Sequence, residues 1–456
     1  MNESRKTLVF AGAAVVLAIL TLVTAPRHVT PDAFFDKGEE FFPEFTDPNV
    51  ARTLEVIQFD ETTARSVPFK VTFEGGRWTI PSHHGYPADG QDRLAQVAAG
   101  LIGITKDDFR TDNAVDYAAC GVIDPIDDSN PSMQGRGTRV TIRGDNDAVL
   151  ADIIIGKSFE GRDGFHLVRV PDQKRVYGTK LNLELSTSFK DWIESDLMMI
   201  GKDEIEKITL KDYSVEERTG QLNERDTVTL TRDGDEWVMV QAPSEKQLDK
   251  VEVSNLVKAI DELAIEGVRP KPDGLTATLS KAANERSITQ SDMLSLQSSG
   301  YYFTRDGRLV SNEGEVQVKT ADGVTYTLRF GEVVFGTGEA VSAGREANAT
   351  GSSELGENRF LMITTSFDAS LFPEPAKPSD ADFTAKPDSL WTDNDRANKA
   401  LQDGWERWQA TINSGMERSD ELNARFARWY YVISSGNFDK LHLTRKDLLS
   451  DLPSSG

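Results

Sequence analysis

Two adjacent histidines, His83 and His84, lie in the segment GGRWTIPSHHGYPADGQDRLAQVAAGL, followed closely by Asp89 and Asp92. Imidazole and carboxylate groups bind zinc and transfer protons, so this segment is the first candidate for a metal or catalytic site. Successive residues of an extended chain point in opposite directions, which places the two rings poorly for holding one ion. The pattern therefore favours a surface loop between a strand and a helix. A metal or catalytic site, and a ligand contact without catalysis, are the alternatives.

Motifs for nucleotide binding, hydrolysis and metal binding are missing from the rest of the sequence. There is no P-loop, Gly-x-Ser-x-Gly, His-Glu-x-x-His or Cys-x-x-Cys. The single cysteine, Cys120, excludes a disulfide within one chain, and its apolar setting after DYAA predicts a buried, unreactive thiol. We therefore assign no catalytic, cofactor-binding or metal-binding residue, expect no cofactor, and favour a non-catalytic role over an enzyme.

Two further segments resemble ligand sites only in part. Asp124, Asp127 and Asp128 lie in DPIDDSNP, where weak calcium binding is conceivable, but the spacing does not match an EF-hand loop. Solvated turn residues are the favoured interpretation. The segment GTGEAVSAG, residues 336–344, lacks the Lys-Ser or Lys-Thr of a phosphate loop, and its composition predicts a flexible loop.

The charge balance restricts the class of partner. The chain has 51 Lys and Arg against 74 Asp and Glu, a formal net charge of −23. Binding to nucleic acid needs clustered basic residues, so nucleic acid is excluded as the expected partner. The 456 residues include 38% hydrophobic residues, enough for two or three globular domains.

An uncharged apolar run occupies residues 7–25, directly after Arg5 and Lys6. As a helix it would be about 28 Å long, close to the hydrocarbon thickness of a bilayer. A cleaved signal peptide is the alternative, but Pro26 disfavours a cut at the end of the run. We expect an uncleaved single-pass anchor in the cell (inner) membrane, with the basic N-terminal tip in the cytoplasm and the bulk of the chain extracytoplasmic, in the periplasm.

Trp78 and Trp237 each begin a segment of the same pattern, in which a Trp-bearing strand, a polar connection and an amphipathic helix follow one another. The offset of 159 positions takes Leu94 to Val253, Val97 to Leu256, Ala98 to Val257, Leu101 to Ile260 and Ile104 to Leu263. The same offset places the two histidines on Ala242 and Pro243, which supports their assignment to a connecting loop. The pattern predicts an internal duplication.

The duplication extends downstream. TRVTIRGDNDAVLADIIIGK and GEVQVKTADGVTYTLRFGE both predict a hairpin whose second strand ends at a glycine, Gly156 or Gly331. We expect an α+β protein with two repeats, each a twisted antiparallel sheet with a packed helix. The expected divisions are a cytoplasmic tip and anchor at 1–27, repeats at 28–200 and 201–374, a Pro- and Asp-rich linker at 375–390, and a helical tail at 391–456.

Two apolar stripes at helical spacing lie in the predicted tail. The first consists of Ala397, Leu401, Trp405, Trp408 and Ile412, and the second of Leu422, Phe426, Trp429 and Tyr430. The aromatics of RFARWYYVIS favour packing against the body of the protein over an exposed partner surface.

The anchor, the duplicated segment beginning GGRWTIPSHHGYPADGQDRLAQVAAGLIGI, the strands of ADIIIGKSFEGRDGFHLVRV and the following TSFKDWIESDLMMI together resemble the domain-of-unknown-function family numbered 4340. The similarity covers residues 69–374, and the tail ARFARWYYVISSGNFDKLHL resembles large planctomycete-type members. The resemblance implies a bacterial envelope protein without catalytic residues to transfer, often encoded near ABC transporters of the gliding-motility type.

We therefore expect a membrane-anchored, non-catalytic binding or scaffold protein, an accessory component of an ABC-transporter-type envelope complex. The alternatives are a binding module for an envelope saccharide, lipid or peptide, and a hydrolase with a site built from dispersed carboxylates. The expected partners are the membrane, through the N-terminal helix, and a membrane protein complex.

Overall fold

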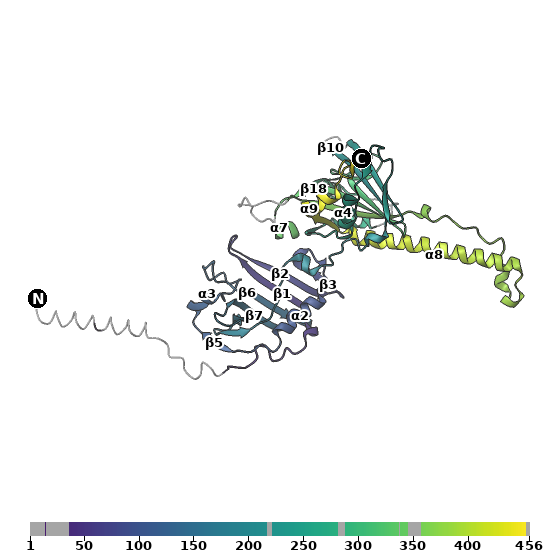
Figure 1. Ribbon diagram of the computed structural model, residues 1–456. Helices are drawn as coiled ribbons and strands as arrows, with labels where there is room; N and C mark the ends of the chain where they lie inside the picture. Colours follow the sequence, from purple (N-terminus) through teal and green to yellow (C-terminus); the bar gives the residue numbers. More distant parts are fainter. Residues whose placement is uncertain are drawn as a thin grey trace, which may run out of the picture. The chain divides into compact units, whose positions relative to one another are not determined.

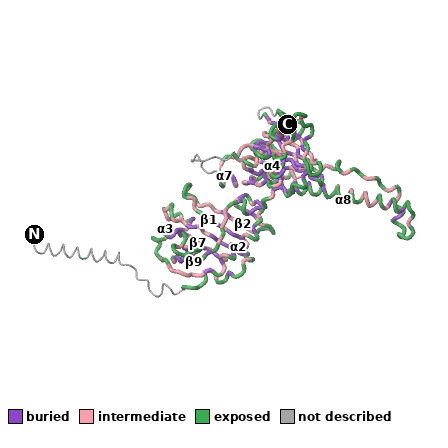
Figure 2. The backbone as a smooth tube through the Cα atoms, viewed as in Figure 1, coloured by how far each residue is buried: buried purple, intermediate pink, exposed green. Residues whose placement is uncertain are grey.

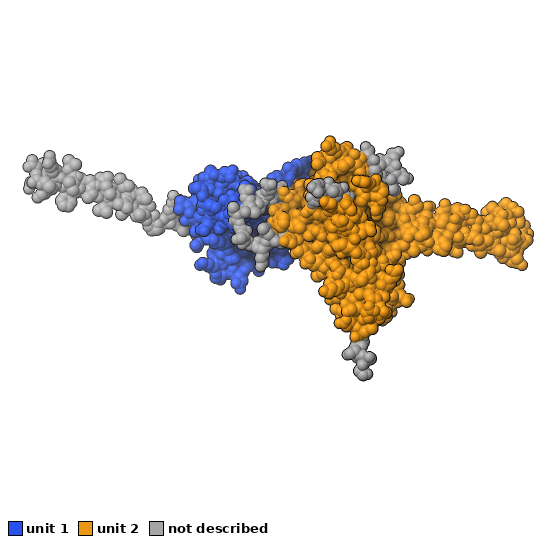
Figure 3. Space-filling model, turned by 90° about the horizontal axis from the view of Figure 1, so that it is seen from above, with its two compact units in different colours: residues 1–70, 91–185 blue, residues 71–90, 186–456 orange. Residues whose placement is uncertain are grey.

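The computed structural model describes residue 14 and residues 36–216, 221–280, 288–336, 338–344 and 357–452. The chain divides into unit 1, residues 1–70 and 91–185, and unit 2, residues 71–90 and 186–456 (Figure 3). The predicted anchor at residues 7–25 lies outside the described residues. Among the residues that are described, we find no helix that combines the length and the apolarity needed to cross a bilayer.

The first sheet has nine strands in the order β4-β3-β2-β1-β6-β7-β8-β9-β5. Its strands are β1 (Thr53–Asp60), β2 (Arg65–Glu74), β3 (Arg77–Ile80), β4 (Tyr86–Pro87), β5 (Asp108–Thr111), β6 (Thr138–Arg143), β7 (Val149–Ser158), β8 (Phe165–Arg169) and β9 (Val176–Lys180). The Gly75-Gly76 turn, with both residues at positive φ, joins β2 to β3. Strand β2 passes from unit 1 into unit 2 at Val71.

The second sheet has eight strands in the order β12-β11-β10-β17-β18-β19-β20-β14. Its strands are β10 (Ile205–Glu216), β11 (Gln221–Asp233), β12 (Glu236–Met239), β14 (Gly267–Pro270), β17 (Glu315–Thr320), β18 (Val324–Val334), β19 (Asn358–Phe367) and β20 (Trp429–Ile433). Two small two-stranded sheets pair β13 (Lys246–Leu248) with β21 (Leu449–Asp451), and β15 (Tyr301–Phe303) with β16 (Leu309–Ser311). The named strands pair antiparallel throughout, which confirms the predicted α+β class with large antiparallel sheets.

The two sheets follow the same path. If β1 is matched to β10, then β2, β3, β6, β7, β8 and β5 correspond to β11, β12, β17, β18, β19 and β14 in both chain order and sheet order. The helix α2 (Gln91–Leu101) corresponds to α4 (Lys250–Asp261). Their buried faces are Leu94, Val97, Ala98 and Leu101 in α2, and Val253, Leu256, Val257 and Ile260 in α4, at the offset of 159. Figure 2 shows buried residues concentrated in the strands and in these two helices.

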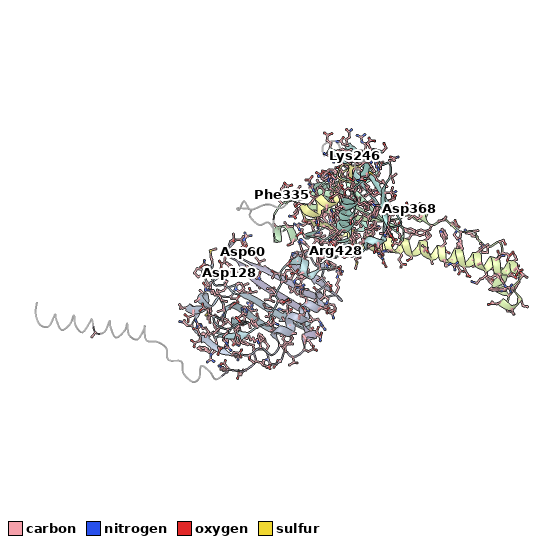
Figure 4. The ribbon with its side chains drawn as sticks, in the orientation of Figure 1. Asp60, Asp128, Lys246, Phe335, Asp368 and Arg428 are labelled. Carbon is pink, nitrogen blue, oxygen red and sulfur yellow. The ribbon has the colours of Figure 1, made fainter. Side chains whose placement is uncertain are left out.

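The last large strand of the second sheet comes from the C-terminal segment. In the first sheet, β9 follows β8 after residues 170–175, whereas β20 follows β19 only after residues 368–428. That excursion contains α8 (Asp393–Ala427), a helix of 35 residues that extends away from the strands of unit 2 (Figure 1). Figure 4 labels Asp368, where the chain leaves β19, and Arg428, where it enters β20. Helix α8 confirms that the predicted tail contains a long helix.

The structure differs from the predicted tail after Phe426. Trp429 and Tyr430, assigned to a helical stripe, begin the buried strand β20, because the run WYYVI consists of aromatic and β-branched residues that favour strands. All five residues of β20 are buried, so the aromatics pack against the body of unit 2, as expected. After β20 the chain forms α9 (Ser435–Leu441), whose Phe438 packs on Phe330 of β18.

Candidate functional site

A pocket of about 820 Å³ lies on one face of the second sheet, entirely within unit 2. This volume falls within the range of ~300–1,000 Å³ that is typical of small-molecule sites. Strands β10, β17, β18 and β19 form its floor. The hairpin β15–β16, the end of α5 (Asp273–Leu279) and the C-terminal half of α8 supply its walls.

The alternation of side chains along each strand gives the sheet one polar and one apolar face. On β17, Glu315 and Gln317 face the pocket, while Val316 and Val318 are buried on the other side. Strand β18 repeats the pattern. The pairing places Lys211, Glu315 and Arg329 side by side on three adjacent strands. The polar floor is therefore a regular consequence of the strand register.

Glu315 is the centre of the floor. Its carboxylate accepts hydrogen bonds from Lys211 Nζ at 2.9 Å, Tyr213 OH at 3.0 Å and Gln317 Nε2 at 2.9 Å. Arg329 Nε lies 3.1 Å from the second carboxylate oxygen. Burial alone would raise the pKa of Glu315, but the charge of Arg329 and the hydrogen bond and charge of Lys211 outweigh it and lower that pKa. Glu315 is thus ionised near neutral pH and lies between two cations.

The wall formed by the hairpin β15–β16 is held by an apolar cluster beside the pocket. Tyr301 of β15 packs with Met362 of β19 and Tyr430 of β20, together with Leu275 and Leu296. At the tip of the hairpin, Thr304 N donates to Arg308 O, and Arg308 pairs with Asp306. The hairpin therefore stands on the sheet by its base and presents its turn to the pocket.

The wall formed by α8 is attached to the edge of β19. Beyond Leu361 no residue of β20 pairs with β19. There Thr365 N donates to Asn423 Oδ1 and Asn423 Nδ2 donates to Thr365 O, each at 2.8 Å. The side-chain amide thus makes the two hydrogen bonds that a neighbouring strand would make. This fixes α8 along the rim of the pocket and closes the edge of the strand.

The histidine pair lies apart from the pocket, in unit 2, and the surface-loop prediction is wrong for His83. Its side chain is buried, with Nδ1 3.0 Å from Ser82 Oγ and Nε2 3.0 Å from Ser342 Oγ, and its ring stacks on Phe189. His84 Nε2 lies 2.7 Å from the carbonyl oxygen of Ala343. The rings are occupied by serines and a carbonyl, which the sequence pattern could not reveal because Ser342 and Ala343 are 259 residues away.

The partners of the histidines lie in the segment 336–344, which was predicted to be a flexible loop. Within it the structure has a short helix, α7 (Glu339–Ser342). The Arg269 guanidinium donates to the carbonyl oxygens of Ala340 and Val341 at 2.6 and 3.0 Å, and so holds the end of α7 against β14. The prediction of a loop failed because a distant arginine supplies the hydrogen bonds that the short helix lacks on its own.

The acidic loop around Asp124, Asp127 and Asp128 surrounds the side chain of Arg136 (Figure 4 labels Asp128). The guanidinium of Arg136 donates to five backbone carbonyl oxygens of residues 124–132, at 2.7 to 3.3 Å. These oxygens are of the kind that calcium prefers, but here an arginine organises them. Within the described ranges, no group of three His, Cys, Asp or Glu could hold a metal ion.

Two other buried groups have structural roles. Cys120 is buried in a cluster with Val122, Ile154, Leu167 and Val176, and burial raises the pKa of its thiol. Lys271, at the end of β14, is buried and donates through Nζ to the carbonyl oxygens of Phe426 and Trp429. Burial lowers the pKa of Lys271 to about 7. Its contacts lie at the C-terminus of α8, where a helix favours a cation.

Sequence reasoning missed the residues that form the pocket. The period-2 alternation in EVQVKT and VTYTLRF does contain the signal, since Glu315, Gln317 and Arg329 fall on one face of their strands. An alternating strand is normally exposed on its polar face, so the pattern by itself does not indicate a pocket. The pattern does not reveal that the hairpin β15–β16 and helix α8 border this face.

Comparison with known proteins gives one result. Residues 78–282 match the model of a family described as a domain of unknown function, DUF4340. The match runs from β3 to just beyond α5. It therefore includes Lys211 and Tyr213 of the pocket floor but neither Glu315 nor Arg329. No curated protein and no solved structure matches the chain significantly.

Proposed function

We propose that this chain, whose residues 78–282 match the model of the domain of unknown function DUF4340, is a membrane-anchored extracytoplasmic binding protein without catalytic activity. The observation that carries the proposal is the pocket of about 820 Å³ on the polar face of the second sheet. Concave sites of this size that combine apolar walls with a few convergent polar groups are the usual form of a small-ligand site.

The state of the pocket carboxyls favours binding over hydrolysis. A carboxylate-based hydrolase needs one protonated acid beside an ionised partner, which requires a raised pKa. The pKa values of Glu315 and Asp306 are both lowered, the first by Arg329 and Lys211 and the second by Thr304 and Arg308. Neither of these two carboxyls is suited to act as the general acid near neutral pH, which favours binding over hydrolysis at this position of the pocket.

Occupancy of the pocket can be tested by native mass spectrometry. The full chain, purified in detergent, is incubated with the small-molecule fraction of the bacterial envelope, and we expect a discrete bound mass. The substitution Ser366→Trp, on β19 at the pocket, should remove it by filling the space. Ser158→Trp, at an exposed strand position of unit 1, is the control. A bound mass that persists in Ser366→Trp, or the lack of one in the parent chain, contradicts the proposal.

The membrane attachment is part of the same proposal. It is supported by the charge-free run at residues 7–25 and by the basic residues before it. We expect the chain to fractionate with the inner membrane and to resist extraction by high salt and alkali, with its C-terminus accessible to protease only from the periplasmic side. A chain recovered in full from the soluble fraction would contradict the anchor.

We also propose that the protein acts beside an ABC-type membrane complex. The support is the resemblance of the sequence to envelope proteins often encoded near such transporters. Crosslinking in intact cells, followed by purification in mild detergent, should recover a permease together with the chain. Recovery of the chain alone would contradict this partner and would leave the pocket to be tested separately.

A further inference from the structure

We infer that the pocket of unit 2 takes a neutral oligosaccharide. The inference rests on the proposed function, because it names the ligand class for the same site. Its argument has three steps, which concern the charges of the lining, its hydrogen-bonding groups, and the ligand shapes that the sheet excludes.

The charges around the pocket disfavour ionic ligands of either sign. Three cationic and five anionic side chains line it, so an anion meets a net negative surround. A cation, in turn, meets a floor where Lys211 and Arg329 together exceed the single charge of Glu315. At the tip of the hairpin, Arg308 is occupied by Asp306. A ligand without charge avoids both the repulsion and the cost of breaking these pairs.

The floor offers groups that both donate and accept hydrogen bonds. Thr327 and Thr364 are paired on adjacent strands, with Gln317 beside Thr327 on the opposite neighbour. Among the described residues, the hydroxyl of Thr327 makes no hydrogen bond, so it is available to a ligand. Closely spaced hydroxyl and amide groups can both donate to and accept from a ligand that is itself rich in hydroxyl groups.

The walls complement the apolar faces of a sugar ring. Phe303 and Leu309 of the hairpin and Phe367 of β19 line the same pocket as the threonines. Sugar rings have C–H faces bounded by hydroxyl edges, so they can contact apolar walls while their hydroxyls reach the floor. A purely apolar chain, such as a lipid tail, would leave the floor without hydrogen bonds, at a cost for each group that loses water.

An extended peptide is excluded from adding to the sheet at this site. Strands β10, β17 and β18 have paired neighbours on both sides, so their backbone groups are already satisfied. The open edge of β19 at Thr365 is occupied by the amide of Asn423. Strand addition needs a free edge, and the pocket floor provides none.

The test is binding of defined probes to the full chain in detergent, measured by isothermal titration. The neutral probes are chitotriose, cellotriose and maltotriose; the charged probes are trigalacturonate and the fully deacetylated chitosan trimer; trialanine is the peptide probe. We expect at least one neutral trisaccharide to bind about tenfold or more tightly than the charged sugars and the peptide. Tighter binding of a charged probe or of trialanine overturns the inference.

A substitution without change of shape tests the contact. Thr327→Val replaces the floor hydroxyl by a methyl group and should weaken the bound trisaccharide about 3- to 10-fold, as expected for one lost hydrogen bond. Thr325→Val, on the same strand and face but outside the lining, should leave affinity unchanged. Equal loss in both variants, or none in Thr327→Val, contradicts a saccharide on this floor.

The two proposals fail in different ways. If native mass spectrometry detects a ligand that Ser366→Trp removes, but no neutral trisaccharide binds, the ligand class is wrong and the binding function stands. If no mass is retained and no probe binds, both are wrong.

Discussion

The two large sheets share one strand path but complete it in different ways. In the first, β9 follows β8 through a short connection, and Val122 packs with Ile154 while Asp124 pairs with Arg139 on one face of the sheet. In the second, β20 follows β19 only after α8, and the hairpin β15–β16 and the end of α5 border the face that carries Glu315. The difference shows that the pocket arises from the connections and not from the sheet itself.

The ion pairs on these faces are inverted in charge. On the first sheet, one cation, Arg139, lies between Asp152 and Asp124 at 2.6 and 3.0 Å. On the second, one anion, Glu315, lies between Lys211 and Arg329. In both sheets, the alternation of side chains places charged residues on one face, and ion pairs between them balance their charges. The second centre lies at the pocket, because the hairpin β15–β16 borders its floor without filling the space above it.

The sharpest way to break the comparison is to remove β20. A chain lacking residues 429–456 loses five buried strand residues and the only strand that connects β14 to the sheet. We expect unit 2 to lose cooperative folding while unit 1 keeps its structure. The loss exceeds what single substitutions cause, since several large buried side chains are removed together.

Cys120 provides the readout for this experiment, because it is the only cysteine of the chain and lies buried in unit 1. Its thiol should stay protected from an aromatic disulfide reagent while limited proteolysis degrades unit 2. A peptide of residues 429–451 added in trans should restore protection of unit 2, and the same peptide with Tyr431→Pro should not. If the truncated chain resists protease as the parent does, β20 is not needed.

The second prediction concerns Lys271, which the offset of 159 places opposite the exposed Asp112 of unit 1. Its pKa is about 7 in the folded chain, below the ordinary value of 10.5. Between these values the unfolded chain binds a proton that the folded chain does not. Stability should therefore rise with pH from about 7 to 10, by roughly 3–4 kcal/mol in total, and be independent of this group below pH 7.

Urea unfolding at a series of pH values measures this effect, with Lys271→Met as the comparison. The variant should lose the rise with pH, because methionine occupies a similar volume without a titrating group. A parallel dependence in the parent chain and in Lys271→Met would show that the buried lysine is not the source. The measurement depends on α8, whose terminal carbonyls Lys271 contacts and which unit 1 lacks.

These contrasts show what sequence reasoning could reach. The offset of 159 predicted the buried faces of α2 and α4 residue by residue, because helix periodicity is local. The Gly75-Gly76 turn before Trp78 is another local signal, because glycine readily adopts the positive φ of a tight turn. Strand β20 was missed because a single strand after a long helix has no nearby partner to reveal it. His83, Glu315 and Arg329 were missed because their partners come from elements far away along the chain.

The third prediction uses two glycines, Gly156 and Gly331, at which equivalent strands were predicted to end; in the structure β7 continues to Ser158 and β18 to Val334. A Cβ at Gly156 would meet the carbonyl oxygen of Cys120, and one at Gly331 would meet that of Ser299. In each sheet, the backbone of a connecting segment thus lies directly against the glycine, with no space for a side chain. Because backbone cannot yield as a flexible side chain can, alanine at either position should cost about 3 kcal/mol.

The two alanine substitutions should each destabilise a different unit. Gly156→Ala should expose Cys120 to the thiol reagent at lower urea, whereas Gly331→Ala should leave that transition in place and lower the stability of unit 2. Gly404→Ala, in α8, meets no neighbouring atom and should be neutral or stabilise by about 0.5–1 kcal/mol. Equal effects of all three substitutions would show that the close crossings do not matter.

The smallest effect is expected at the two ion-pair centres. Glu315→Gln keeps the shape of the side chain but leaves Lys211 and Arg329 without their shared anion, so we expect a loss of about 2 kcal/mol. Asp152→Asn removes one of the two carboxylates that flank Arg139, while Asp124 remains, and should cost about 1 kcal/mol or less. Urea unfolding, with Cys120 reactivity to identify unit 1, measures both.

The pH dependence of stability tests the charge of Glu315 directly. The folded chain holds the pKa of Glu315 below its ordinary value of 4.5, so its contribution is present above pH 4.5 and is lost as the pH falls below that value. Parent and Glu315→Gln should therefore differ at pH 7 and converge on acidification. A constant difference between them would mean that glutamine disturbs packing and not charge. In that case the floor of the pocket would depend on the shape of residue 315, and the inverted charges of the two sheets would not explain a difference between Glu315→Gln and Asp152→Asn.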